Sequence, residues 1–261
     1  MPRDAGRRAF GADPANYHRA RPDYPDWVYR TLRSRCALGP GTATFEIGAG
    51  TGKATRRLLE AGADPLIAVE PDPRLAGFLR ATHPDPALTV LVSAFEDAEL
   101  EDQAFDLGVS GTAFHWLEEE AALAKIARLL RPGGWWAAFW NVFGDDSRPD
   151  PFHLATRDLL KGPDNPAAGE RGIPFGLDSE ARLAALTRTG AFDIVDTIMS
   201  AWSLVLDEDQ AAALYATYST VSLRADREAV LAELRRIARD TFGGRVVRNM
   251  TTSLYIARRA A

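Results

Sequence analysis

A glycine-rich turn is the stretch of this sequence best suited to hold a ligand. It reads Phe-Glu-Ile-Gly-Ala-Gly-Thr-Gly-Lys over residues 45–53, between a short apolar run and a predicted helix. Glycine adopts positive φ at little cost and has no Cβ. Gly48, Gly50 and Gly52 therefore let the backbone turn sharply and approach a bound molecule closely.

The spacing of these glycines separates three kinds of ligand loop. The dinucleotide fingerprint Gly-x-Gly-x-x-Gly fails, because its third glycine would fall at Lys53. A phosphate-binding P-loop also fails, because too few residues separate Gly48 from Gly52 and Ala54 stands where Ser or Thr is needed. What remains is Glu-x-Gly-x-Gly-x-Gly, beginning at Glu46, and the neighbouring segments must decide what it binds.

An acidic residue at the end of the second predicted strand is suited to bind a nucleoside. In an open parallel sheet, ligands bind beyond the carboxyl ends of the strands. Glu70 stands at such an end, where its carboxylate can accept hydrogen bonds from two adjacent ribose hydroxyls. That role suits any nucleoside, NAD included. The alternative role, capping the next helix, is better filled by Asp72.

Aromatic residues follow the third and fourth predicted strands. Phe95 either stacks on an adenine ring or belongs to the hydrophobic core. The fourth strand leads into Ala-Phe-His-Trp at residues 113–116. No histidine has a metal-ligand partner at helical spacing, so no metal site is predicted. His115 is then either structural or in contact with a ligand.

Short apolar strands alternate with helices from residue 42 onward, which is typical of a doubly wound parallel α/β sheet. Residues 1–16 lack periodicity and predict a loose arm, and Asp23 or Asp26 is expected to cap a helix that runs through Cys36. Strands are predicted over 42–47, 64–70, 87–93, 105–110, 134–141, 191–199 and 246–256. Helices are predicted over about 51–61, 73–82, 118–131, 152–160, 178–189, 207–220 and 224–240.

Two long stretches interrupt this alternation. Residues 144–176 are rich in proline, and residues 203–243 are helical. Connections of this length inside a domain are usually functional or mobile, so both are predicted to form the acceptor pocket. The predicted divisions are an arm and helix at 1–40, a core at 41–143, the two insertions, a core helix and strand at 177–202, and a closing strand at 244–261.

Composition and charge exclude several classes of function. The 261-residue chain has a net charge of -5, whereas nucleic-acid binding usually needs a basic face, so no nucleic-acid partner is predicted. Cys36 is the only cysteine, which excludes an internal disulfide and fits a reducing cytoplasm. No apolar run is long enough to span a membrane and no signal-peptide core occurs. We expect a soluble cytoplasmic protein, monomeric or homodimeric, without a membrane partner.

Several motifs, in order, carry a resemblance to a known family. They are Tyr-His-x-x-Arg-Pro-x-Tyr-Pro from residue 17, the glycine-rich turn, Val-Glu-Pro, Ala-Phe-Glu, Ala-Phe-His-Trp, and Leu-Leu-Arg-Pro-Gly-Gly before a Trp-Asn strand end. Over about residues 15–142 the chain resembles small-molecule class I S-adenosylmethionine-dependent methyltransferases, in particular the branch of trans-aconitate methyltransferase and bacterial natural-product methyltransferases. The Asn-Pro-Pro-Tyr motif of enzymes that methylate exocyclic amines of bases is absent.

The resemblance implies a fold and a cofactor site. The fold would be a Rossmann-like doubly wound sheet of seven strands, the last antiparallel, with helical lid insertions. The cofactor would be S-adenosylmethionine, with S-adenosylhomocysteine as product, and the arm would close over it. The implied residues are Gly48, Gly50 and Gly52 beneath the methionyl part, Glu46 at its amino group, Tyr17, His18 and Arg21 at its carboxylate, Glu70 and Pro71 at the ribose, Ala94, Phe95 and Glu96 around adenine, and Ser110 and Phe114 after the fourth strand.

Methyl transfer from a sulfonium is an in-line displacement, which depends on alignment of the reacting atoms and exclusion of water. Positioning can supply on the order of 7–11 kcal/mol. A general base is therefore optional: a carboxylate acceptor needs none, whereas a phenol, hydroxyl or amine gains about 100-fold or more from one. His115, then Tyr24 and His18, are the candidate bases.

Aromatic residues in and near the insertions predict the acceptor pocket. A neutral aromatic lining favours a planar or apolar small metabolite, methylated at O, N or C, as in secondary metabolism. Core packing of the lid helices is the alternative explanation. Two other functions stay open, a non-catalytic or regulatory protein that binds the same cofactor and, disfavoured by the glycine spacing, an NAD-dependent oxidoreductase. The predicted acceptor residues are Tyr24, His115, Trp116, Trp140, Phe175, Tyr215 and Tyr218.

Overall fold

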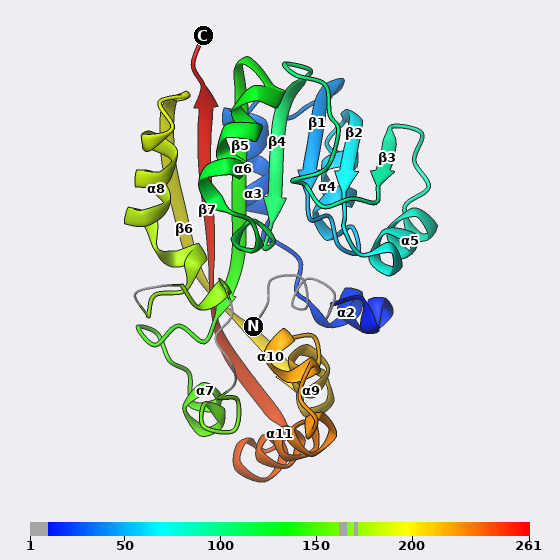
Figure 1. The fold of residues 1–261 in the computed structure, drawn as a ribbon. Helices are drawn as coiled ribbons and strands as arrows, with labels where there is room; N and C mark the ends of the chain where they lie inside the picture. Colours follow the sequence, from blue (N-terminus) through cyan, green and yellow to red (C-terminus); the bar gives the residue numbers. More distant parts are fainter. Residues whose placement is uncertain (1–9, 162–165, 170–171) are drawn as a thin grey trace.

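Seven strands form one sheet in the computed structural model, which describes residues 10–161, 166–169 and 172–261 (Figure 1). The strand order is β3-β2-β1-β4-β5-β7-β6, and β7 runs antiparallel to both of its neighbours. This confirms the predicted Rossmann-like doubly wound sheet with an antiparallel last strand. The strands are β1 (Thr42–Ile47), β2 (Ala63–Val69), β3 (Leu88–Leu91), β4 (Phe105–Gly111), β5 (Leu130–Phe143), β6 (Phe192–Asp207) and β7 (Arg245–Arg259).

Helices cover both faces of the sheet because its strands are apolar on both sides. Along β5, Trp136 and Ala138 pack into the core beneath α6 and α8, whereas Ala137 and Phe139 pack toward α3 and α4. This alternation follows from the two-residue period of a strand. The helices are α2 (Pro14–Ala20), α3 (Asp26–Arg35), α4 (Lys53–Glu60), α5 (Pro73–Thr82), α6 (Glu119–Leu129), α7 (Pro151–Thr156), α8 (Ser179–Arg188), α9 (Glu208–Tyr215), α10 (Ser219–Ser222) and α11 (Arg227–Phe242).

The N-terminal segment differs from its prediction. A loose arm was expected through residue 16, but α2 begins at Pro14 and the side chain of Asp13 caps it by accepting from the Asn16 N–H (2.9 Å). A capping aspartate followed by proline at the first helical position is a start signal that was available in the sequence. The part of the predicted arm before Phe10 lies outside the described residues.

The start of α3 also corrects a prediction. Pro25 occupies the N-cap position and no side chain caps the helix. The two expected caps form ion pairs with α4 instead: Asp23 pairs with Lys53 (2.8 Å), and Asp26 pairs with Arg57 (2.6 Å). These pairs hold α3 and the chain before it against the helix that follows the glycine-rich turn.

Strand β6 continues well past its predicted end at residue 199, whereas β7 begins within one residue of its predicted start at residue 246. The paired ends of these two strands carry a small helical layer. The strands pair from Phe192↔Arg259 as far as Asp207↔Arg245. We call this layer, formed by α7, α9, α10 and α11 on the extended ends of the two strands, the helical cap (Figure 1). It has a hydrophobic core of its own that includes Leu214, Val230 and Leu234. The helix predicted at 207–220 is divided into α9 and α10, and that at 152–160 ends at Thr156.

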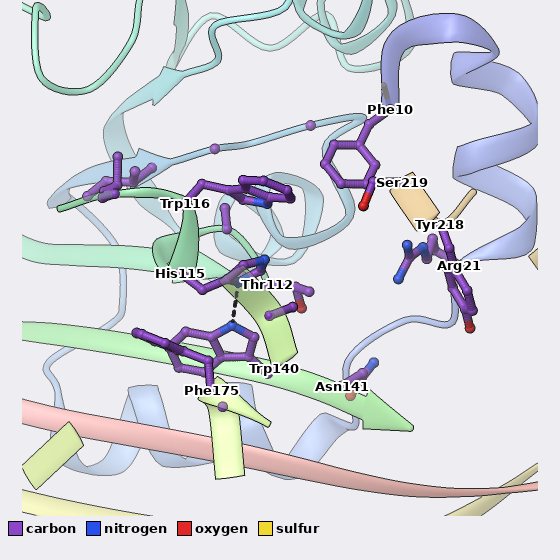
Figure 2. A pocket seen from close by; sticks show the side chains of 18 of the residues that line it. Phe10, Arg21, Thr112, His115, Trp116, Trp140, Asn141, Phe175, Tyr218 and Ser219 are labelled. Atoms are coloured by element: carbon purple, nitrogen blue, oxygen red, sulfur yellow. Dashed lines mark hydrogen bonds between the residues drawn. The ribbon is translucent and has the colours of Figure 1, made fainter. Parts of the chain in front are cut away.

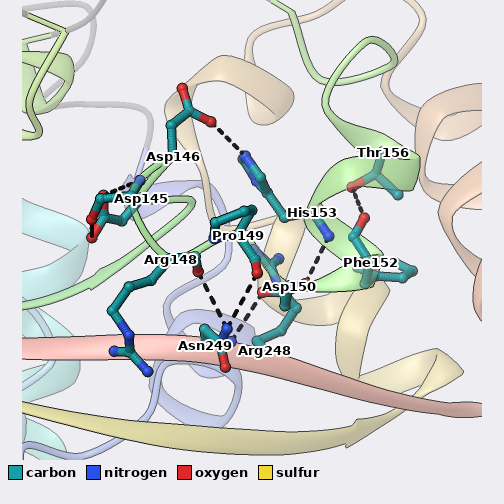
Figure 3. A network of polar contacts seen from close by, with 11 residues as sticks. Asp145, Asp146, Arg148, Pro149, Asp150, Phe152, His153, Thr156, Arg248 and Asn249 are labelled. Atoms are coloured by element: carbon teal, nitrogen blue, oxygen red, sulfur yellow. Dashed lines mark hydrogen bonds and ion pairs between the residues drawn. The ribbon is translucent and has the colours of Figure 1, made fainter.

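A buried ion pair joins the start of α7 to β7 (Figure 3). Asp150 caps α7 by accepting from the His153 N–H (2.7 Å). Its other carboxylate oxygen accepts from Arg248 Nε (2.8 Å) and from the Asn249 N–H (2.9 Å) on β7. Asp150 and Arg248 are almost completely buried. One carboxylate thus fixes both the start of α7 and its position against β7.

Candidate functional site

A cavity of about 330 Å³ opens at the carboxyl ends of the strands (Figure 2). It is lined by the segments that follow β1, β2, β4 and β5 and by residues from α2 and α10. The strand order reverses between β1 and β4, which is the position where open α/β sheets bind ligands. The cavity therefore lies at the carboxyl ends of the strands, where the ligand site was predicted. Residues of α2 and of the helical cap contribute to its walls.

The glycine-rich turn forms the floor of this cavity. Gly48 and Gly50 line it with positive φ angles of 67° and 57°. A Cβ added to Gly48 would lie 2.4 Å from the Cβ of Ala113, so no side chain fits there. Gly52 has a different role from the one predicted, because it lines no wall of this cavity. It precedes α4 with φ 89°, and a Cβ there would lie 2.5 Å from Leu79.

We expect Gly48→Ala to weaken binding in this cavity and to lower stability by about 1–3 kcal/mol, because the change adds backbone strain and a clash with Ala113. Thermal denaturation and titration with S-adenosylhomocysteine measure the two effects. Gly77→Ala is the matched control: Gly77 lies in α5, and a Cβ there meets no atom within 4 Å. Equal stability and equal affinity in the two variants would contradict the role given to Gly48.

Glu70 faces the cavity and is bonded to the glycine-rich turn. Its carboxylate accepts from the Gly50 N–H (2.8 Å) and from the Asp72 N–H (2.9 Å). Burial raises the pKa of Glu70 to about 7. Asp72 caps α5 by accepting from the Arg74 N–H, as the sequence predicted, so Glu70 and Pro71 are left to line the cavity.

Glu46 lies beneath the turn rather than in the cavity. It is fully buried and accepts from the Thr55 hydroxyl (2.6 Å), and burial raises its pKa to about 8. It lines a smaller adjoining cavity with Tyr17 and Tyr24. This position suits the predicted role of fixing the turn.

The residues predicted around adenine lie together on one wall. Ala94, Phe95 and Glu96 all line the cavity. The Phe95 ring is also packed parallel to Phe45 at 6.2 Å between centroids, so it belongs both to the core and to the wall. Lys125 donates to the Phe95 carbonyl (2.7 Å) and so anchors this segment to α6. Phe95 is therefore a core residue that also lines the cavity, and its stacking on adenine stays a prediction.

Arg21 enters the cavity from the end of α2. Its Nε and Nη2 donate to the hydroxyl and carbonyl of Thr217 (2.8 and 3.1 Å), and its guanidinium lies 4.6 Å from the ring centroid of Tyr218. Within the described ranges no carboxylate pairs with it. Tyr17 also lines the cavity, with its ring 5.3 Å from the same guanidinium. Arg21 thus offers a cation to an anionic group of a ligand.

An aromatic wall closes the other half of the cavity (Figure 2). We use this name for Trp116, Trp140 and Phe175, all of which line the cavity as predicted. Trp140 donates from its indole Nε1 to Nδ1 of His115 (3.1 Å). His115 is buried, and burial lowers its pKa to about 3, with the positive charge of Arg21 acting in the same direction.

The structure does not support the three candidate bases. An indole N–H can only donate, so Nδ1 of His115 must accept and the lone pair needed by a base is already used. Tyr24 donates its hydroxyl to Thr112 (2.9 Å), and burial raises its pKa well above the usual range. His18 lines neither cavity; its ring packs 5.3 Å from Phe78, and burial lowers its pKa.

Three further predicted site residues lie in the interior instead. Ser110 is fully buried and donates to the Ile47 carbonyl (3.0 Å). Phe114 belongs to the core between the sheet and α6. Tyr215 packs inside the helical cap against Phe152, whereas Tyr218 does line the main cavity. The positions of Phe114 and Tyr215 fit core packing, because an aromatic ring removes more surface from water in the interior than at a cavity wall. The Ser110 hydroxyl is satisfied by a backbone carbonyl instead.

Several wall residues were missed by reasoning from the sequence. Phe10, Thr112, Asn141 and Ser219 line the cavity. Asn141 ends the Trp-Asn strand, so its place at a strand end was available as a signal; its amide donates to the Asp23 carbonyl (3.1 Å). Phe10 lies in a short 3₁₀ helix, Thr112 follows β4 and Ser219 begins α10, so the approach of each to the cavity depends on tertiary contacts.

Two kinds of feature are absent from the described residues. No group of three or more His, Cys, Asp or Glu side chains there is arranged to hold a metal ion. No helix in the same residues is long and apolar enough to cross a membrane.

Comparison with known proteins assigns the domain around this cavity. Residues 45–138, from β1 to β5, match a family model described as a methyltransferase domain. The chain therefore carries a methyltransferase domain over residues 45–138. This confirms the family resemblance found in the sequence, whereas the narrower branch stays a prediction.

Relatives and solved structures agree with the domain assignment. An uncharacterized methyltransferase of Mycobacterium tuberculosis is 36% identical over 138 residues, which is 51% of this chain and 52% of the relative. The chain thus spans about half the length of the curated relatives it matches. A putative type II methyltransferase of Anaeromyxobacter dehalogenans shares the fold, with a TM-score of 0.64, 21% identity, and coverage of 92% of this chain and 97% of that one.

A second solved structure contains a ligand. It is a phosphoethanolamine N-methyltransferase 2 of Haemonchus contortus in complex with S-adenosyl-L-methionine. Its TM-score is 0.53 at 14% identity, and the alignment covers 90% of this chain and 53% of that one. At this level of identity the likeness is one of fold.

Proposed function

We propose that the protein transfers the methyl group of S-adenosylmethionine to a small planar or apolar molecule. The observation that carries this proposal is the continuity of one cavity from Glu70 and the glycine-rich turn to the aromatic wall. A nucleoside and an aromatic acceptor would then lie side by side without solvent between them, which an in-line displacement requires.

The residues around the first half of the cavity fit S-adenosylmethionine. Glu70 would accept from the two ribose hydroxyls, and the Ala94–Glu96 wall would lie against adenine. Arg21 supplies the charge partner for the methionyl carboxylate. Gly50 leaves open space on its Cβ side at the cavity, where no protein atom lies within 4 Å, so the backbone of the turn can approach the cofactor closely there.

The chemistry divides between cofactor and protein. When bound, S-adenosylmethionine supplies an electrophilic methyl group. The protein aligns the acceptor with the methyl group and keeps water away. The aromatic wall excludes water, and its π faces favour a nearby positive sulfur. None of the three candidate bases is placed to take a proton, so acceleration rests on alignment of the acceptor.

Binding followed by product detection tests the proposal. Titration with S-adenosylhomocysteine should show saturable binding, and incubation with S-adenosylmethionine and a metabolite set should give a product heavier by one methyl group on an acceptor that also raises the melting temperature. Binding of the cofactor without a methylated product from any stabilising metabolite would favour a non-catalytic cofactor-binding protein. Preference for NAD over S-adenosylhomocysteine would contradict the proposal.

Nucleoside affinity should fall at acidic pH. The pKa of Glu70 is raised to about 7 in the free protein, and the ribose hydroxyls bind its ionised form better. Affinity is therefore full above about pH 7 and falls by up to about tenfold per pH unit below it. The probe is 5′-methylthioadenosine, which has the ribose and adenine but no amine that titrates in this range.

The proton balance gives a direct measurement of this linkage. Calorimetry in two buffers of different ionisation enthalpy at pH 6 should show release of a proton on binding, and Glu70→Gln should remove most of that release. Proton uptake, or release that Glu70→Gln does not reduce, would contradict the assignment.

A further inference from the structure

His115 is built into the cavity wall by contacts on several sides. The indole of Trp140, which donates to its Nδ1, is itself held by Gly176: a Cβ there would lie 2.7 Å from the indole Cγ. Tyr255 packs 5.9 Å from the same indole and donates its hydroxyl to the Gly176 carbonyl (3.0 Å). These contacts leave Trp140 little freedom to turn away from His115.

This bond determines which nitrogen of His115 carries the proton. Because Nδ1 accepts from Trp140, the proton of the neutral ring must be on Nε2. Figure 2 shows the second nitrogen turned away from Trp140, toward the space that the labelled side chains surround. The rings of Trp116 and Phe175 lie 5.3 and 6.1 Å from the imidazole. The wall therefore presents one N–H group between aromatic rings.

The charges near this N–H group favour a ligand that presents a hydrogen-bond acceptor and disfavour a cationic one. Arg21 is a cation, and its charge acts with burial to lower the pKa of His115. Glu70 and Glu96 line the nucleoside half of the cavity instead. Arg182 lies behind Phe175, over its ring, and is paired with Glu119 (3.0 Å). An ammonium group beside His115 would thus face a donor and a cation, with no acceptor supplied by the imidazole.

We propose that His115 is a fixed, neutral hydrogen-bond donor that selects acceptors presenting an oxygen lone pair, such as a hydroxyl, phenolate, enolate or carbonyl group. The proposal rests on the methyltransferase function proposed above and names the chemical class of its acceptor. His115 then positions the acceptor and lowers the cost of negative charge on its oxygen. Trp140 is a positioning residue that acts through His115.

The tautomer itself can be measured without any acceptor. In protein labelled with ¹⁵N-histidine and saturated with S-adenosylhomocysteine, NMR should show His115 with Nε2 protonated and Nδ1 unprotonated from pH 5 to pH 8. Loss of its signals in His115→Gln assigns them. Trp140→Phe should give a mixture of tautomers or a ring that titrates. A wild-type His115 that is protonated on Nδ1, or that becomes charged in this range, would overturn the proposal.

Selectivity is tested with two probes of similar shape, 2-naphthol and 2-(aminomethyl)naphthalene, titrated against protein saturated with S-adenosylhomocysteine. The wild type should prefer the naphthol. His115→Leu should reduce that preference about 2- to 10-fold, the value of one hydrogen bond. His115→Gln, whose amide can place an N–H near the Nε2 position, should retain most of it. An unchanged preference in His115→Leu would contradict the proposal.

Controls separate this inference from folding and from the proposed function. His153→Gln makes the same change at a histidine of the helical cap that does not line the cavity, and it should leave the affinity for both probes unchanged. If His115→Leu does not fold, Trp140→Phe must show the reduced preference, or the proposal fails. Loss of S-adenosylhomocysteine binding by the wild type would defeat the proposed function itself. Binding that is intact with unchanged selectivity would defeat only the role of His115.

Discussion

Replacement of Asp150 by alanine is expected to destabilise the protein by about 3–5 kcal/mol, because it leaves a buried charge without its partner. The carboxylate accepts from Arg248, from the Asn249 N–H and from the His153 N–H, so all three donors lose a bond. Arg248 is 1% exposed and would remain among aromatic rings, 5.4 Å from the centroid of Tyr215. Chemical denaturation measures the change.

Two variants control this prediction. Asp146→Ala removes an acid from the same segment, but Asp146 is 84% exposed and pairs only with His153 (3.2 Å) among the described residues, so the loss should stay within about 1 kcal/mol. Arg248→Met in the Asp150→Ala background removes the stranded charge and should recover part of the stability. A loss below about 1 kcal/mol for Asp150→Ala, or no recovery in the double variant, would contradict the account.

The same ion pair explains why the helical cap was only partly predictable. Hydrophobic periodicity gave helices and strands in the right order, since each local pattern reports which face is buried. Nothing local indicates that Asp150 pairs with a residue of β7, or that β6 continues past residue 199 to pair with the whole of β7 and carry a second core. The length of β6 is set by its pairing with β7, and the two strands are far apart in the sequence, so this pairing leaves no local signal.

At the site, the predictable part was the part determined by backbone conformation. Gly48 and Gly50 were identified because positive φ and close approach favour glycine, and Glu70 because a strand end fixes its place. The roles of His115 and Gly52 were not predictable. Whether a histidine is a base depends on the partner of each nitrogen, here an indole from another strand. Glycine is needed at position 52 because Leu79 of α5 packs against it, and not because a ligand does.

Removal of the Glu70 carboxylate should have the largest effect on the cofactor. We expect Glu70→Ala to weaken binding of S-adenosylhomocysteine by at least about 100-fold. Hydrogen bonds to a charged group contribute about 1.5–3 kcal/mol each, and two ribose hydroxyls would lose theirs. The Gly50 and Asp72 N–H groups would also lose their acceptor, so the glycine-rich turn would be less well fixed before binding.

Two further variants and a deoxynucleoside probe distinguish a contact of Glu70 with the ribose from its support of the glycine-rich turn. Glu96→Ala removes an exposed carboxylate from the same cavity and should change affinity less than about threefold, because contributions of exposed charged groups are small and no ribose hydroxyl is assigned to Glu96. Glu70→Gln keeps the shape but points one amide N–H at a backbone N–H, so it should also bind weakly. With 2′-deoxyadenosine as probe, which lacks one hydroxyl, the penalty of Glu70→Ala should shrink relative to adenosine. An equal penalty for both nucleosides would mean that Glu70 supports the turn and does not contact the ribose.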